Sequence, residues 1–160
     1  MLTALMLSAL AAPATGLATI QYGTPPPNFA IPAARGGHYL TDLRGRVVVI
    51  DFWATWCHVC TDEMDDFVRA QQDFGSRVAV VTISDEDPGV ASEYFGRQKI
   101  GLPLVEDPLS AIFRLYSVSR VPVTLVLTPG GSVSYVSVGA LNWTELDQAI
   151  EHAQASPGSG

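Results

Sequence analysis

The chain has 160 residues, a formal net charge of −7 at pH 7 and an apolar share of 48%. This length fits one domain with a hydrophobic core of its own. The negative charge argues against a partner that is bound through its phosphate backbone, such as a nucleic acid. The two cysteines are too few for a disulfide scaffold, so they form a single bridge, a redox couple or half of a metal site.

The first segment of the chain is apolar and built from small residues. Residues 2–12 form the apolar stretch, and alanine-rich sites overlap its end and follow it. This pattern resembles the hydrophobic region and cleavage zone of a secretory signal peptide, although no positively charged region precedes it. The run is shorter than the about 20 apolar residues that a transmembrane helix needs. We therefore expect residues 1–20 to be an export signal or membrane anchor; a frayed end or a core helix is the alternative.

Prolines separate this segment from the rest of the chain. Residues 25–27 are consecutive prolines, which favour an extended polyproline II conformation. We predict a proline-rich spacer at residues 21–27, a folded domain at residues 28–154 and a flexible tail at residues 155–160. Residues 28–46 carry spaced apolar side chains around Gly36 and Gly37, which predicts a short β-hairpin with these glycines at its turn.

Both cysteines lie where a predicted strand leads into a predicted helix. Residues 46–53 are largely a continuous apolar run, which is typical of a strand buried on both faces. Residues 61–74 place apolar side chains at helical spacing, and Gly75 suits the end of that helix. Cys57 and Cys60 stand between these elements. A Cys-x-x-Cys pair at a strand-to-helix junction is typical of a dithiol redox site.

The helix start explains why this pair favours redox chemistry. A helix N-terminus presents free backbone N–H groups and a partial positive charge, which stabilise a thiolate on Cys57 and lower the pKa of its thiol. Cys60, one turn later, can close a disulfide onto Cys57. An inert disulfide is the first alternative, but its two-residue loop would constrain the unfolded chain little. A metal site is the second, although the histidines show no ligand spacing: His38, His58 and His152.

The remainder of the chain alternates strands and helices. Acidic residues early in the helix after Cys60 suit the helix dipole, and we expect a solvated helix face there: Asp62, Glu63, Asp65 and Asp66. Asp-Pro pairs predict the next two helix starts, with aspartate as N-cap and proline in the first helical position, at Asp87-Pro88 and Asp107-Pro108. Further strands are predicted at residues 77–84, 102–105, 121–127 and 132–138, and a type II turn is predicted at residues 128–131. The helix after Asp107-Pro108 carries an apolar stripe of Leu109, Ile112, Phe113 and Tyr116. The last helix is predicted at residues 143–154 and opens with a capping box of Asn142 and Glu145.

Two segments carry a family resemblance. Residues 47–60, VVVIDFWATWCHVC, resemble the active-site segment of the thioredoxin superfamily, and residues 120–124, RVPVT, resemble the segment that holds its cis-proline. The predicted hairpin, and an extra strand and helix before Pro122, are similar to TlpA/ResA-like members and peroxiredoxins, the redoxin or AhpC/TSA branch. The resemblance implies an α/β thioredoxin-like fold: a central mixed β-sheet flanked by helices, with an N-terminal β-hairpin and a strand–helix insertion before the cis-proline strand.

Four residues are candidates for the chemistry. Cys57 would attack a partner disulfide, and Cys60 would resolve the mixed disulfide. Asp51 lies inside the apolar strand, so burial would raise its pKa, and the resemblance implies that it takes the proton of Cys60. A surface or ion-paired carboxylate is the alternative for Asp51. The resemblance also implies that Pro122 is cis, which would expose the backbone of Val121 to a client strand.

Other residues are expected to line the site or tune it. Trp53 and Trp56 would wall the site, with a core role equally open for Trp53. His58 and Val59 lie between the cysteines, and an imidazolium on His58 would stabilise the neighbouring thiolate unless the side chain is exposed and idle. Asp85 follows the second strand and aligns with an acid that lies by the active site in ResA-like proteins. A merely solvated loop acid is the alternative for Asp85.

The predicted function is that of a thiol–disulfide oxidoreductase, which exchanges electrons between its dithiol and cysteines of client proteins outside the cytoplasm. The resemblance implies apocytochrome c, in cytochrome c maturation, as one candidate client, and the sequence does not select it over others. The protein would take electrons from an upstream thiol donor, would need no cofactor or metal, and would be a monomer, tethered to a membrane if its N-terminus is retained. Two alternatives stay open. A peroxiredoxin-like peroxidase carries a Pro-x-x-x-Thr pattern where this chain has Trp-Ala-Thr-Trp at residues 53–56, and a Sco-like copper-binding module needs three residues between its cysteines and a distal histidine.

Overall fold

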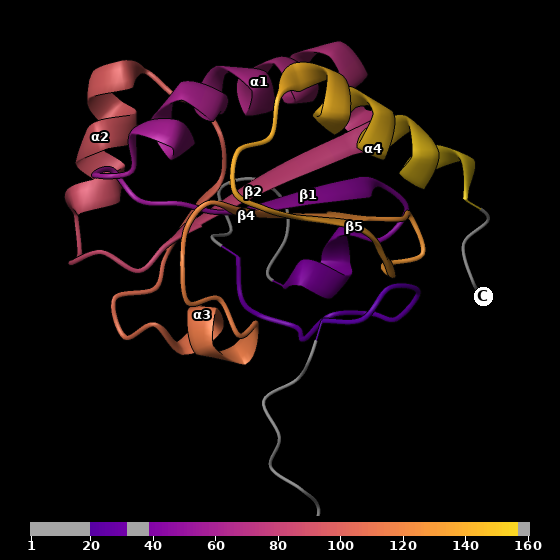
Figure 1. Cartoon of the computed structure of the whole chain (residues 1–160), viewed down its shortest axis with the longest axis horizontal. Coiled ribbons are helices and arrows are strands. Elements are labelled where there is room, and N and C mark those ends of the chain that lie inside the picture. Colours follow the sequence, from indigo (N-terminus) through magenta and orange to yellow (C-terminus); the bar gives the residue numbers. More distant parts are fainter. Residues whose placement is uncertain (1–19, 32–38, 157–160) are drawn as a thin grey trace, which may run out of the picture.

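Five strands form one mixed sheet at the centre of the protein (Figure 1). The computed structural model describes residues 20–31 and 39–156. The strands are β1 (Val47–Phe52), β2 (Val78–Ser84), β3 (Leu104–Glu106), β4 (Val123–Leu127) and β5 (Val133–Val138). Their order across the sheet is β3-β2-β1-β4-β5, in which β1, β2 and β3 are parallel and β4 is antiparallel to β1 and β5. The predicted mixed sheet is confirmed.

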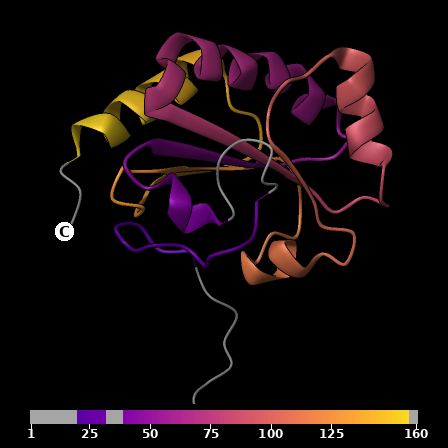
Figure 2. The same ribbon diagram turned by 180° about the vertical axis from the view of Figure 1, so that it is seen from behind.

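Helices cover both faces of this sheet. They are α1 (His58–Phe74), α2 (Val90–Gln98), α3 (Ala111–Leu115) and α4 (Trp143–Ala155). Helices α1, α2 and α4 lie on one face, and α3 lies on the other (Figures 1 and 2). Alternate side chains of β1 serve the two faces, because Val47 and Val49 belong to the core on the α1 side and Val48 and Ile50 to the core on the α3 side. All six residues of β1 are buried, as the continuous apolar run predicted.

The strand register brings three loops to one edge of the sheet. Phe52, the last residue of β1, lies opposite Ile83 of β2 and Val123 of β4. Strands β1 and β2 therefore end, and β4 begins, at the same edge. The loop that leads from β1 to Cys57, the loop after β2 and the loop before β4 meet there. The last of these contains the Val121–Pro122 peptide bond, which is cis as predicted.

The predicted start of α2 is wrong. Its N-cap is Gly89, at a φ of 91° that glycine tolerates, and not Asp87. The N–H group of Val90 donates to the carbonyl of Asp87, so the Asp87-Pro88 pair lies in a turn before the helix. The N–H group of Gly89 donates to the Glu106 carboxylate at 2.9 Å. The acid at this helix start therefore comes from strand β3.

The predicted start of α3 is wrong in position but right in its capping acid. The N-cap by backbone is Ser110, so Leu109 precedes the helix and is exposed instead of joining the apolar stripe. The buried carboxylate of Asp107 nevertheless accepts hydrogen bonds from the first three N–H groups of the helix, at 2.8, 2.8 and 3.0 Å: those of Ala111, Ile112 and Phe113. Asp107 thus caps α3 from a position farther upstream.

In the described N-terminal part of the domain, a short 3-10 helix, η2 (Leu40–Leu43), precedes β1. Among the described residues, the predicted hairpin is represented by one antiparallel bridge between Ala30 and Tyr39, and its predicted glycine turn, at residues 36–37, lies outside them. The predicted export segment, apart from Ile20, and residues 157–160 of the predicted tail also lie outside them. In the part of the chain that the structure describes, no helix has the length and apolar character needed to cross a membrane.

The turn after β4 and the start of α4 were predicted from local residue patterns, and one of these predictions is wrong. Gly131 closes the turn by donating its N–H group to the carbonyl of Thr128. The left-handed residue of this turn is Gly131, with a φ of 88°, and not Gly130, so the predicted type II geometry is wrong. The capping box at the start of α4 is confirmed, since Asn142 and Glu145 exchange side chain to backbone hydrogen bonds at 3.1 and 3.2 Å.

Candidate active site

The two cysteines form a disulfide at the start of α1. Cys57 is the N-cap of this helix, which begins at His58. The N–H group of Cys60 donates to Sγ of Cys57 at 3.2 Å, and the two Cα atoms are 5.2 Å apart. Cys57 keeps 9% of its surface exposed, whereas Cys60 keeps 1%. An incoming sulfur atom therefore reaches Cys57 first.

Hydrogen bonds hold the loop that joins β1 to Cys57. The N–H group of Trp53 donates to a carbonyl of β2 at 3.0 Å, and the N–H group of Cys57 donates to the carbonyl of Ala54 at 3.1 Å. Between them, the Glu86 carboxylate accepts from the N–H group of Thr55 at 2.8 Å and from its hydroxyl at 2.6 Å. The position of the loop is thus set by β2 and by the segment that follows it.

The two tryptophans of this loop have different environments. Trp53 is fully buried, and its ring stacks on Phe95 at 5.1 Å and lies 5.5 Å from Tyr94. It belongs to the same core cluster as both cysteines. Trp56 is 69% exposed. Of the two roles that the sequence left open for Trp53, the structure therefore favours the core role, and Trp56 alone presents its ring to solvent.

Asp51 lies on the face of β1 that carries α1, which is the side of the cysteines. It is fully buried, and its Oδ1 accepts a hydrogen bond from the hydroxyl of Thr124 at 3.4 Å. Its Oδ2 is buried and has no protein hydrogen-bond partner. Burial first, and then the negative charge of Glu63, raise the pKa of Asp51 well above its ordinary value, and the bond from Thr124 opposes this. The predicted burial and direction of the pKa shift are confirmed.

Glu63 is a second buried carboxylate on this side, and the expected solvated helix face is wrong at this residue. Its Oε1 accepts from the N–H group of Leu141, and its Oε2 is buried without a protein partner. Burial raises the pKa of Glu63, the bond from Leu141 opposes the shift, and two neighbouring aspartates of α1 add to it. The sequence held a signal for this burial, because Glu63 follows Cys60 by three residues and precedes the buried Phe67 by four.

A pocket of ≈130 Å³ opens beside Trp56. Three predicted site residues from three different loops line it, Trp56, Asp85 and Val121, and the other lining residues are Phe113, Val118, Ser119 and Arg120. The buried Pro122 follows Val121 directly. The structure therefore brings together the tryptophan loop, the loop after β2 and the cis-proline loop around one hollow.

The two adjacent acids after β2 have different contacts. Asp85, the predicted residue, accepts a hydrogen bond from the Ser110 hydroxyl at 3.0 Å. Glu86 is the one that bonds to the loop before Cys57, and it also accepts from the Ser84 hydroxyl at 3.0 Å. Sequence reasoning missed Glu86 because residue type and spacing do not distinguish two acids that follow the same strand.

The family model described as the AhpC/TSA family matches residues 22–136, a span that contains the disulfide, the cis-proline and the whole sheet except the end of β5. The chain belongs to the AhpC/TSA family. Thiol-disulfide oxidoreductase ResA of Bacillus subtilis is 30% identical to it over 129 residues, which are 79% of this chain and 72% of that protein. Thioredoxin-like protein YneN of the same organism is 26% identical over 137 residues, 82% of this chain and 80% of YneN.

A solved structure of a thiol:disulfide interchange protein has a similar fold. A Chlorobium tepidum protein assigned as the thiol:disulfide interchange protein DsbE superposes with a TM-score of 0.76 at 28% identity, covering 84% of this chain and 98% of that one. The predicted thioredoxin-like fold and the TlpA/ResA-like resemblance are therefore confirmed. Together with the disulfide at α1, these findings identify this family member as a thiol–disulfide oxidoreductase of the ResA/DsbE type.

His58 and Val59 are exposed on the first turn of α1 in this AhpC/TSA member. Both can therefore contact a protein that approaches the disulfide, and their tuning roles stay predictions. Within residues 20–31 and 39–156, no three His, Cys, Asp or Glu side chains gather where they could hold a metal ion.

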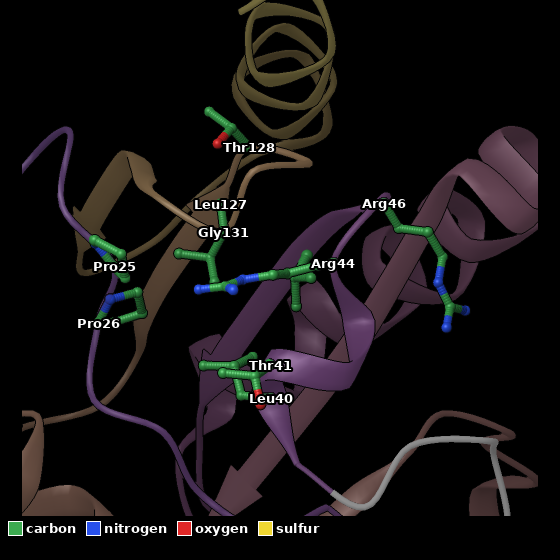
Figure 3. A pocket seen from close by; sticks show the side chains of 10 residues that line it. Pro25, Pro26, Leu40, Thr41, Arg44, Arg46, Leu127, Thr128 and Gly131 are labelled. Atoms are coloured by element: carbon green, nitrogen blue, oxygen red, sulfur yellow. The ribbon is translucent and has the colours of Figure 1, made fainter. Parts of the chain in front are cut away.

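A further pocket of this AhpC/TSA chain lies at the opposite edge of the sheet, where β1 begins and β4 ends (Figure 3). The Arg44 side chain extends toward Gly131, with Pro25 and Pro26 on one side of the pocket. Its volume of ≈20 Å³ holds about one water molecule. It is too small for a substrate, and it lies at the opposite ends of these strands from the cysteines.

Proposed function

We propose that this oxidoreductase passes electrons from an upstream thiol donor to disulfides of client proteins outside the cytoplasm, with Cys57 as the attacking residue and Cys60 as the resolving residue. The observation that carries the proposal is the place of Cys57 at the N-cap of α1. Cys57 is the more exposed of the two cysteines, and its sulfur accepts a hydrogen bond from the N–H group of Cys60. A helix N-terminus stabilises negative charge at this position, which favours the thiolate that attacks disulfides.

Reduction of a client begins with the Cys57 thiolate. It attacks one sulfur of the client disulfide, so that a Cys57–client bond forms while the client S–S bond breaks and the second client sulfur leaves as a thiolate. Cys60 loses its proton and attacks the Cys57 sulfur. The Cys57–Cys60 disulfide forms, the first client sulfur leaves, and two electrons have passed to the client. The donor dithiol reduces the disulfide again by the reverse sequence.

Asp51 takes the proton of Cys60, with Glu63 as its partner. Both carboxylates are buried on the α1 side, and each has one oxygen without a protein hydrogen bond. Burial raises the pKa of both carboxylates, and the negative charge of Glu63 raises the pKa of Asp51 further, so that Asp51 binds a proton more readily than an exposed acid does. The accepted proton is then available to the departing client thiolate.

The client chain lies along the cis-proline loop. Val121 precedes the cis bond and lines the pocket beside Trp56, which supports a client segment that runs along the Val121 backbone as an added strand. A client side chain next to the cysteine would enter the pocket between Asp85 and Arg120. Trp56, which lines the same pocket, would contact this client side chain.

Proteins with paired cysteines are the clients that we propose, and the resemblance to the thiol-disulfide oxidoreductase ResA supports this class. Apocytochrome c fits, since the cysteines of its Cys-x-x-Cys-His site must be reduced before haem is attached. The apolar segment within residues 1–18 supports export and a membrane tether. Outside the cytoplasm the default state of cysteines is oxidised, so a reductant there depends on a donor. We propose that the protein acts as a monomer.

The reduction potential of the Cys57/Cys60 couple tests the direction of transfer. A value near about −270 mV, with reduction of insulin and of an oxidised Cys-x-x-Cys-His peptide, is expected for a reductant. A value near about −120 mV would mark an oxidant and overturn the direction. Turnover of hydrogen peroxide without disulfide exchange would replace the proposal with a peroxidase function.

A further inference from the structure

Glu86 contacts the active-site loop but has no part in the proton and electron transfers above. Its two carboxylate oxygens bind Thr55 in a bidentate manner, Oε2 to the N–H group at 2.8 Å and Oε1 to the hydroxyl at 2.6 Å. Oε2 also accepts the hydroxyl of Ser84, the last residue of β2, at 3.0 Å. The carboxylate is partly buried, so water competes little for these bonds.

Thr55 is the middle of a short loop whose ends are held by backbone bonds. The N–H group of Trp53 is tied to β2, and the N–H group of Cys57 is tied to the carbonyl of Ala54. Thr55 stands two residues before Cys57 and next to the exposed Trp56. A restraint on Thr55 therefore limits the movement of the backbone at Trp56 and of the point at which Cys57 enters the helix.

We propose that Glu86 is a positioning residue for Cys57: its bidentate bond to Thr55 joins the loop before the disulfide to the end of β2 and holds Cys57 in its N-cap position. This inference rests on the proposed role of Cys57 as the attacking residue. When the restraint is removed, the hydrogen bond from the N–H group of Cys60 to the Cys57 sulfur is formed for less of the time. The thiolate of Cys57 is then less stabilised. A hydrogen bond to a charged group contributes about 1.5 to 3 kcal/mol, which corresponds to about tenfold to a hundredfold in an equilibrium.

Two substitutions of Glu86 separate positioning from charge. Glu86→Ala removes both the bonds and the negative charge, whereas Glu86→Gln removes the charge but keeps an oxygen that can accept the N–H group of Thr55. A carboxylate that acted only as a nearby charge would disfavour the thiolate, so both variants would then speed the reaction of Cys57 alike. A positioning carboxylate predicts opposite results: loss of rate in Glu86→Ala and its retention, within about threefold, in Glu86→Gln.

The experiment measures three quantities on the reduced full-length protein. These are the rate of alkylation of Cys57 by iodoacetamide as a function of pH, the rate constant for reduction of an oxidised client peptide, and the hydrogen exchange rate of the Thr55 amide. Glu86→Ala is expected to lower both reaction rates by about tenfold or more and to raise Thr55 exchange by a similar factor. Glu93→Gln is the matched control, because Glu93 is an exposed acid on α2 whose paired group is Arg97.

Thr55→Val provides a second variant, since it removes the hydroxyl bond and leaves the carboxylate in place. It is expected to lower the reaction rates in the same direction as Glu86→Ala, and the two changes together are expected to be less than additive. Equal effects of Glu86→Ala and Glu86→Gln, or additive effects with Thr55→Val, would overturn the positioning role. If the wild type lacks disulfide exchange, the proposed function fails, while alkylation and Thr55 exchange still decide the role of Glu86.

Discussion

Helices α1 and α3 begin close behind strands of the same sheet, yet their N-termini are capped in different ways. At α3, the Asp107 carboxylate accepts hydrogen bonds from three successive N–H groups. At α1, the cap is Cys57, whose sulfur accepts a single N–H group, that of Cys60. The capping carboxyl group at α3 is present in both redox states, whereas a thiolate exists at α1 only after the disulfide is reduced. One cap stabilises the fold, and the other is available to a transient charge.

The buried acids near these helices show the same difference. Both oxygens of Asp107 have N–H partners. Asp51 and Glu63, on the side of the cysteines, each have a buried oxygen without a protein partner. A buried carboxylate whose two oxygens both accept hydrogen bonds is a structural group. A buried carboxylate with an unpaired oxygen in a low-dielectric environment binds a proton more readily. The comparison supports a structural role for Asp107 and the proposed proton-binding role of Asp51 and Glu63.

Cys57→Ser is expected to have the largest effect, because it keeps the cap of α1 and removes its sulfur. Serine is a good N-cap, and the lost disulfide closes a loop of only two residues, so the unfolding free energy falls by only about 1 kcal/mol. Insulin reduction falls to background. Cys60→Ser is expected instead to accumulate a mixed disulfide with the client, visible on a non-reducing gel. A Cys57→Ser protein that still reduces insulin would remove Cys57 from the attacking role.

Asp51→Asn is expected to slow resolution of the mixed disulfide by about 100-fold, because an amide cannot take the proton of Cys60. Stopped-flow decay of the mixed disulfide, from about pH 6 to about pH 9, measures it. Glu63→Gln is expected to act in the same direction with a smaller effect. Asp65→Asn, which changes an exposed acid of α1, serves as the control. Decay that is the same in Asp51→Asn and in the wild type at every pH would exclude Asp51 from the mechanism.

Asp107→Ala is expected to lower stability and to leave activity unchanged, whereas Cys57→Ser mainly removes activity. It removes three hydrogen bonds from the start of α3 and lowers the unfolding free energy by about 2 kcal/mol, while insulin reduction per folded molecule stays unchanged. Urea denaturation measures the loss. Glu93→Ala, at an exposed position, is expected to stay within about 0.5 kcal/mol of the wild type. Lost activity at full stability would contradict the structural assignment of Asp107.

The smallest effect is a fall in stability of the oxidised protein as the pH rises. Burial raises the pKa of Asp51 and of Glu63 in the folded state above their ordinary values of 3.8 and 4.5. As the pH rises through those ordinary values, the unfolded chain releases protons first, so the unfolding free energy declines until the raised pKa values are passed. Asp51→Asn is expected to flatten this decline in urea titrations between about pH 4 and about pH 8. An unchanged slope would mean that Asp51 is not the group responsible.

Short-range patterns were enough for the elements that hold the disulfide. The apolar run of β1, the spacing of Cys57 and Cys60 and the glycine at the end of α1 each involve neighbours within one strand or one helical turn. The same is true of the capping box at α4. The Asp87-Pro88 pair predicted the wrong start for α2. The helix begins later, and the N–H group of its N-cap, Gly89, donates a hydrogen bond to Glu106, 17 residues away.

The sequence by itself determined the redox pair and the buried central strand, since neighbouring residues encode both of them, and its resemblance to the thioredoxin superfamily pointed to the cis-proline. Only the tertiary structure decided which acids are buried on the side of the disulfide and which contact the loop before it. Glu63 is buried where it binds Leu141, 78 residues away, and Glu86, instead of Asp85, reaches Thr55 across 31 residues. The cost of a buried charge depends on how distant segments pack around it, and no local periodicity carries that information.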